Sequence, residues 1–203
     1  MAEPDAPQIY LVSPPEIDAG TFPDRLAAVL DARPVACLRL ALATREEDVL
    51  IRAVDALRAV TEPRDVALVI AEHVGLAERL GLDGVHLTGA RGVRAARKAL
   101  GADAIVGAFC GASRHDGINA GEAGADYVAF GPCSGATLGD GQVAEAELFA
   151  WWSEMIELPV VAEGGLDEQT IRTLWPITDF LAFGEEIWRA DDAAARLAAL
   201  LAN

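Results

Sequence analysis

Two short apolar runs end in glycine and carry the groups best suited to chemistry in this chain. The first is residues 124–132 (GADYVAFGP) and the second is residues 159–165 (PVVAEGG). A strand buried on both faces of a parallel sheet is a near-continuous apolar run. Glycine at its carboxyl end lets backbone N–H groups approach a phosphate. The pattern therefore predicts a parallel α/β protein with a phosphate-binding site at one rim of its sheet.

Eight apolar runs alternate with helix-length segments along the chain. The expected strands are residues 8–13, 34–40, 66–71, 84–87, 105–109, 127–130, 160–162 and 180–183. This alternation implies right-handed βαβ units, and eight of them favour a closed (β/α)8 TIM barrel. No linker divides the chain, so residues 1–203 are predicted as one barrel domain. Thr44, with Glu47 three residues later, is expected to cap the second helix.

Composition excludes several classes of protein. The chain is 52% hydrophobic and 24% charged, which favours a large core, and its net charge of −16 disfavours nucleic acid and anionic membranes as partners. No apolar stretch approaches the ~20 residues of a membrane span, and the first seven residues do not resemble a signal peptide. Cys37, Cys110 and Cys133 form no CxxC pair, so reduced thiols in the cytoplasm are expected.

The residues that follow the expected strands are the candidates for a site, because a barrel of this kind works at the carboxyl ends of its strands. Those expected to bind a phosphorylated small molecule are Arg39, Gly131, Ser134, Gly164, Gly165 and Gly184. The simpler alternative is that the glycines only close tight turns. His86 lies inside an apolar run and is expected to be a core histidine that makes structural hydrogen bonds.

Five segments resemble, in order, the signature segments of thiamine phosphate synthase and the related thiazole tautomerase. They are residues 9–12, 38–39, 83–87, 124–132 and 159–165. The resemblance implies a (β/α)8 barrel, usually dimeric. It also implies a reaction that joins an aminopyrimidine diphosphate to a thiazole phosphate, with Mg²⁺ on the diphosphate and pyrophosphate leaving. It makes Arg39 a candidate catalytic cation and Glu72 a candidate metal ligand. His115 and Glu163 become candidate acid–base groups of the tautomerase type.

The chain departs from the family pattern at the positions that carry charge. Ala41 stands where the family has a lysine, and Arg91 stands where it has a second metal-binding aspartate. Residues 133–139 contain no lysine, and Glu185 takes the place of a serine near the last phosphate position. A diphosphate leaving group needs cations as its bond to carbon breaks. The departures therefore predict weak or altered transfer.

Three functional hypotheses follow. The first is a transferase of the thiamine phosphate synthase type with a reduced cation set. The second is a tautomerase-like isomerase that uses His115 or Glu163, and the third is a non-catalytic paralogue that binds a metabolite. A homodimer is also expected, because Trp151, Trp152 and Trp188 offer apolar area for an interface.

Overall fold

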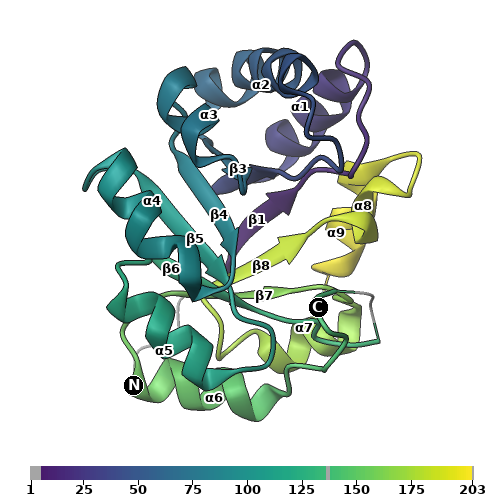
Figure 1. Cartoon of the computed structure of the whole chain (residues 1–203). Helices are drawn as coiled ribbons and strands as arrows, with labels where there is room; N and C mark the ends of the chain where they lie inside the picture. Colours follow the sequence, from purple (N-terminus) through teal and green to yellow (C-terminus); the bar gives the residue numbers. More distant parts are fainter. Residues whose placement is uncertain (1–5, 136–137, 203) are drawn as a thin grey trace.

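The fold is a closed parallel barrel of eight strands with helices on its outside (Figure 1), which confirms the predicted TIM barrel. The computed structural model describes residues 6–135 and 138–202. Its strands are β1 (Gln8–Val12), β2 (Cys37–Leu40), β3 (Ala67–Ala71), β4 (Gly84–Thr88), β5 (Ile105–Phe109), β6 (Tyr127–Phe130), β7 (Val160–Glu163) and β8 (Phe180–Phe183). Each strand pairs with its neighbours in chain order, and β1 pairs with β8 to close the barrel.

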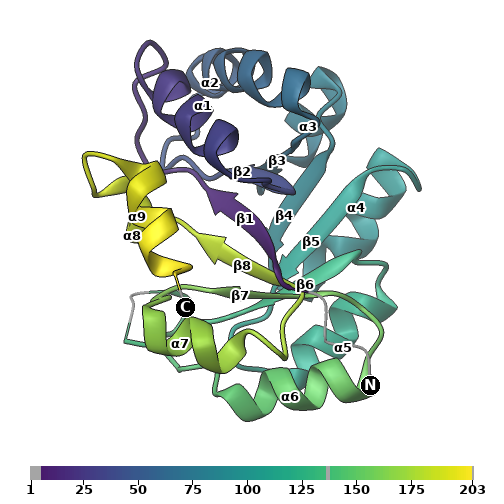
Figure 2. The ribbon, with the colours of Figure 1, turned by 180° about the vertical axis from the view of Figure 1, so that it is seen from behind.

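The helices surround the strands in both views (Figure 2). They are α1 (Phe22–Ala32), α2 (Glu47–Thr61), α3 (Val74–Leu80), α4 (Val93–Leu100), α5 (Arg114–Glu122), α6 (Ala146–Met155), α7 (Glu168–Leu174), α8 (Glu185–Trp188) and α9 (Ala193–Leu200). The 3₁₀ turns η1 (Glu62–Arg64) and η2 (Ala90–Gly92) precede β3 and α4. In α1, the buried Phe22, Leu26, Val29 and Leu30 recur with helical spacing and face the strands.

Side-chain hydroxyls accept backbone hydrogen bonds near two helix starts. Ser113 caps α5, since its hydroxyl accepts a hydrogen bond from the Asp116 N–H at 3.1 Å. The predicted start of the second helix at Thr44 is wrong, because α2 begins at Glu47. The Thr44 hydroxyl instead accepts from the Glu46 N–H at 3.1 Å and forms a turn before the helix.

The barrel separates two apolar layers. The outer layer lies between strands and helices and contains most of the core. The inner cluster fills the barrel with side chains from alternate strand positions, namely Tyr10, Cys37, Val69, Tyr127, Ala129, Val161 and Ala182. Since strand side chains alternate between faces, the residue two places after an inward side chain also points inward. Arg39 follows Cys37 in this way, and Glu163 follows Val161.

The tryptophans expected at an interface lie mostly in the core, so that argument for a homodimer is wrong. Trp152 and Trp188 are buried, and only Trp151 of the three is partly exposed. The Trp152 indole N–H donates to the Leu158 carbonyl at 2.8 Å, and that of Trp188 donates to the Val12 carbonyl at 2.7 Å. A helix packed on a barrel has one buried face, and large aromatic rings fill it. Among the described residues, no helix has the length and apolarity to cross a membrane.

Candidate active site

A small cavity opens at the carboxyl ends of the strands. Its volume is about 190 Å³. It is lined by Arg39, Ala41, Ala71, Glu72, His86, Thr88, Phe109, Leu138, Gly139 and Glu163. We call it the mouth cavity. Active sites of TIM barrels lie at this rim, so the structure brings three of the predicted site residues, Arg39, Glu72 and Glu163, to the expected place.

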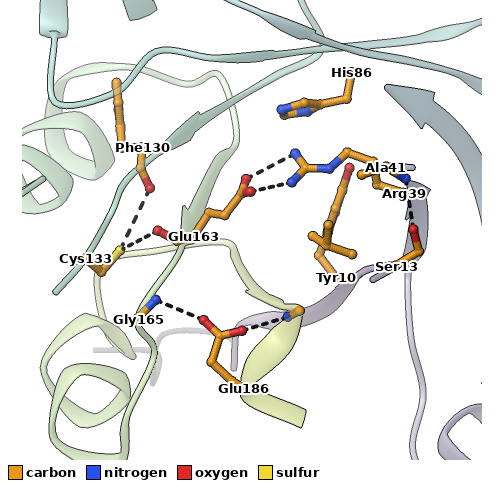
Figure 3. Close-up of polar contacts among 12 residues, drawn as sticks. Tyr10, Ser13, Arg39, Ala41, His86, Phe130, Cys133, Glu163, Gly165 and Glu186 are labelled. Carbon is orange, nitrogen blue, oxygen red and sulfur yellow. Dashed lines mark hydrogen bonds and ion pairs between the residues drawn. The ribbon is translucent and has the colours of Figure 1, made fainter. Parts of the chain in front are cut away.

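Arg39 and Glu163 form a buried ion pair across the barrel (Figure 3). One guanidinium nitrogen donates to Glu163 Oε2 at 3.1 Å and the other donates to Oε1. The two side chains are only 7% and 8% exposed. Burial alone would lower the pKa of Arg39, but the Glu163 carboxylate outweighs it and the pKa is raised. The cation expected to meet a diphosphate is therefore already neutralised by the chain's own carboxylate.

A chain of hydrogen-bonded rings lies beside this ion pair. The Tyr10 and Tyr127 hydroxyls are 2.8 Å apart, and the Tyr127 hydroxyl is 2.9 Å from His86 Nδ1. The Tyr10 ring also lies 5.8 Å from the Arg39 guanidinium carbon. Gly107 makes room for this arrangement, since a Cβ there would lie 2.0 Å from Cζ of Tyr127. Burial raises the pKa of both tyrosines, so both are neutral at pH 7.

His86 is a buried core histidine, as predicted, but only half of its hydrogen-bonding capacity is met. Burial and, second, the Arg39 charge hold its pKa well below the ordinary value, so the imidazole is neutral. Within the described residues, His86 Nε2 and Arg39 Nε have no hydrogen-bond partner. An unsatisfied buried polar atom costs about 1–3 kcal/mol. These two atoms, on side chains that line the mouth cavity, are the unmet polar groups of the site.

At the loops after β7 and β8, where a phosphate site is predicted, backbone N–H groups bind a side chain of the protein. Gly164 and Gly165 have φ of 82° and 73°, a conformation that favours glycine. Glu186 Oε1 accepts from the Gly165 N–H at 2.9 Å and from the Leu166 N–H at 3.4 Å. Its Oε2 accepts from the Gly184 N–H at 2.9 Å (Figure 3). We call these three N–H groups, of Gly165, Leu166 and Gly184, the cup.

The other predicted phosphate-binding residues support the loops around the cup. The Ser134 hydroxyl donates to the Gly165 carbonyl at 2.7 Å. Gly131 permits close packing of two strand ends, since a Cβ there would lie 2.0 Å from the Glu163 carbonyl oxygen. For Gly131 and Ser134 the structure thus shows structural contacts. Phosphate binding by the predicted residues remains a prediction.

The predicted metal ligand Glu72 has a different partner. Its Oε1 accepts a hydrogen bond from the Thr88 N–H, and its φ of 64° is uncommon for a residue other than glycine. Mg²⁺ prefers an octahedron of hard oxygen ligands. In residues 6–135 and 138–202, no three His, Cys, Asp or Glu side chains are grouped to hold a metal ion. Arg91 is exposed at the expected second carboxylate position, so this set of donors is poorer than the one that the resemblance implies.

His115 lies apart from the groups just described. It is exposed in the first turn of α5 and does not line the mouth cavity. Glu185, which replaces the family serine, is exposed and pairs with Arg189 one turn along the chain. The structure therefore brings together Arg39 with Glu163, and the cup glycines with Glu186. It does not add His115 to either group.

Sequence reasoning missed Tyr10, Tyr127 and the role of Glu186. The two tyrosines lie in apolar runs, at positions that alternate with outward-facing residues. This alternation could have predicted that they point into the barrel. Glu186 is one of several acidic residues near the glycines in the sequence. Its contact depends on how Ile187 and Trp188, both buried, fix the short helix α8 beside the cup.

Comparisons with known proteins agree with the resemblance. A family model described as "Thiamine monophosphate synthase" matches residues 9–184. The chain is 43% identical over 194 residues to thiamine-phosphate synthase of Rhodospirillum centenum, covering 93% of each protein. It is 39% identical over 203 residues to that of Erythrobacter litoralis, covering 96% of this chain and 95% of the relative.

A solved structure shows the same fold. Thiamine phosphate pyrophosphorylase from Pyrococcus furiosus matches with a TM-score of 0.81 at 20% identity, covering 95% of this chain and 94% of that one. At 20% identity, this structural likeness supports only the barrel fold. Family membership rests on the family model and on the sequence identities to the two relatives. The chain belongs to the thiamine monophosphate synthase family.

Proposed function

We propose that the chain is a slow transferase of the thiamine phosphate synthase type. In that reaction the thiazole nitrogen attacks the methylene carbon of the aminopyrimidine diphosphate. A C–N bond forms, the C–O bond to the diphosphate breaks, and pyrophosphate leaves with the electron pair. Family membership supports the reaction. The neutralised Arg39 supports the low rate.

The rate argument rests on charge at the mouth cavity. Pyrophosphate gains negative charge as the C–O bond breaks, and cations placed in advance stabilise that charge. Arg39 is the cation among the residues that line the mouth cavity, and it makes two hydrogen bonds to Glu163. Losing one preorganised charge-stabilising group typically lowers a rate by ~10²–10³. Ala41 removes a further cation of the family pattern.

Magnesium supplies the remaining positive charge in the family reaction. Here Glu72 belongs to no group of three potential metal ligands in the described part of the chain. We therefore assign no step to the metal and expect transfer to depend only weakly on Mg²⁺. We expect Arg39 to contact the diphosphate once a hydrogen bond between its guanidinium and the Glu163 carboxylate breaks.

A steady-state assay of thiamine phosphate formation, with and without Mg²⁺, tests the proposal. We expect turnover at least ~10²-fold below the usual enzyme median of ~10 s⁻¹, and a further loss in Arg39→Ala. Glu163→Gln, which frees the guanidinium, should bind pyrophosphate more tightly by calorimetry. Glu185→Gln is the matched control, because Glu185 pairs only with the exposed Arg189 among the described residues.

Two results would overturn this reading. Turnover near ~10 s⁻¹, abolished by Arg39→Ala and by Glu72→Ala, would show an intact synthase site. No detectable transfer by wild type or by Glu163→Gln would leave the non-catalytic paralogue. A tautomerase gains no support from the geometry, since His115 does not line the mouth cavity and Glu163 is paired with Arg39.

A further inference from the structure

The cup is occupied by the chain itself. Glu186 uses both carboxylate oxygens to accept hydrogen bonds from three backbone N–H groups, which come from two different loops. Loops after the seventh and eighth strands of TIM barrels commonly hold phosphate. Glu186 thus presents two anionic oxygens where a phosphate would present its own. The contact itself shows that these N–H groups can hold an anion.

Packing fixes this carboxylate in place. Glu186 is half-buried, and the next two residues, Ile187 and Trp188, which complete α8, are buried. Trp188 donates a hydrogen bond to the Val12 carbonyl at the end of β1. Its ring packs edge-on against that of Phe22, with 4.9 Å between the ring centroids. Arg25 also donates to the Trp188 carbonyl at 2.9 Å. The backbone that carries Glu186 is therefore held close to the cup.

We propose that Glu186 is a specificity-determining residue, whose carboxylate is the resident anion of the cup and must be displaced before a phosphate monoester binds. Three consequences follow. The binding free energy of a phosphorylated ring ligand is reduced by the cost of breaking the contacts between Glu186 and the cup. The same ring with a free hydroxyl does not displace Glu186, so its binding carries no such cost. The displaced carboxylate also stays near the bound phosphate and repels it. The chain therefore discriminates between thiazole phosphate and thiazole alcohol far less than an open cup would.

This inference rests on the proposed function for the identity of the ring. Nitrogen attack on the pyrimidine carbon does not involve the phosphate of the thiazole. Weak discrimination at the cup would therefore let the alcohol serve as an alternative acceptor in the same displacement, with thiamine as the product in place of thiamine phosphate.

Calorimetry on the full chain tests the inference without any need for turnover. The ligands are thiazole phosphate, thiazole alcohol and inorganic phosphate, and the proteins are wild type, Glu186→Ala, Glu186→Gln and the control Glu185→Ala. A site blocked by its own side chain about nine-tenths of the time binds about tenfold more weakly, equivalent to about 1.4 kcal/mol. We expect Glu186→Ala to bind both phosphate ligands at least tenfold more tightly, with the affinity for the alcohol unchanged. Glu186→Gln should show a smaller gain, and Glu185→Ala should match wild type.

A spectroscopic measurement gives an independent readout. Phosphate titration should shift the amide signals of Gly165, Leu166 and Gly184 in Glu186→Ala at concentrations that leave the wild-type signals unmoved. If the alanine and glutamine variants, both folded by circular dichroism, bind phosphate no more tightly than wild type, the inference is wrong. Weaker phosphate binding in Glu186→Ala would also overturn it. Neither outcome depends on catalysis, so a failure of the proposed transfer reaction would be seen separately.

Discussion

Breaking the buried Arg39–Glu163 pair should strongly destabilise the barrel, whereas removing both partners should not. Both side chains are over nine-tenths buried. Two unit charges about 4 Å apart attract by about 4 kcal/mol at an effective dielectric constant of ~20. Removing one partner of a buried pair typically costs about 3–5 kcal/mol, since the other charge stays buried without compensation. We therefore expect Glu163→Leu and Arg39→Met each to lose about 3–5 kcal/mol of unfolding free energy.

The double variant Arg39→Met/Glu163→Leu separates charge from packing. Replacing a whole buried ion pair by apolar side chains of similar volume is often neutral or stabilising, so its unfolding free energy should return to near that of wild type. Urea denaturation of all four proteins gives the coupling energy of the pair. For a chain of this size, a loss of 3 kcal/mol corresponds to a fall in Tm of roughly 6–12 °C.

Glu185→Ala is the control for these measurements, since it breaks an exposed pair with Arg189 and should cost less than about 0.5 kcal/mol. A coupling energy below about 1 kcal/mol for Arg39 and Glu163 would refute the reasoning. Such a value would mean that water reaches the pair and that the Arg39 charge is available to a diphosphate. The proposed reason for slow transfer would then be lost.

Three further predictions concern His86, the three cysteines and two glycines. His86 stays neutral in the folded protein because burial and the Arg39 charge lower its pKa, whereas the unfolded chain takes up a proton below about pH 6.5. Stability should therefore fall by up to about 1.4 kcal/mol per unit as pH drops below 6.5, and urea titrations of His86→Gln should lose that part of the slope. An unchanged slope would contradict this. Burial raises the pKa of each of the three cysteines to about 12, so a disulfide reagent at pH 8 should react slowly until urea is added, and rapid labelling of a native thiol would count against it. Gly107→Ala should cost about 1–3 kcal/mol by overpacking against Tyr127. Gly75→Ala, in a helix with open space around the added Cβ, should instead stabilise by about 0.5–1 kcal/mol, and equal melting temperatures would refute the contrast.

The barrel was predictable from the sequence because every strand is buried between an inner cluster and a layer of helices. Such strands are apolar on both faces, so each appears as a short uninterrupted run. All eight predicted runs coincide with strands, to within a few residues at their ends. The start of α2 was not predictable from Thr44. A threonine just before a helix can cap it or can close a turn that precedes it, and the sequence is the same in both cases.

The site was predictable only in part. Strand alternation places Arg39 and Glu163 inside the barrel, but their pairing requires knowing that the barrel closes, which leaves only β1 and β8 between β2 and β7. The tryptophans were misplaced because hydrophobicity alone does not tell which face of α6 or α8 contacts the strands. Glu186 reaches the cup through a contact between two loops. Nothing in the local sequence distinguishes it from the exposed Glu185 beside it.

The effect of charge on this site is local. A net charge of −16 would repel a phosphorylated ligand at long range, but at physiological salt exposed charges are screened beyond about 8 Å. Charges that affect a bound phosphate must therefore lie within that distance of it. Two carboxylates do so. Glu163 neutralises the cation at the mouth cavity, and Glu186 fills the backbone donors of the cup. Under the proposed function, each takes the place of a contact with a phosphate group of a substrate, and the two act through different strands and loops. A substitution at either position should therefore restore one anion contact and leave the other blocked.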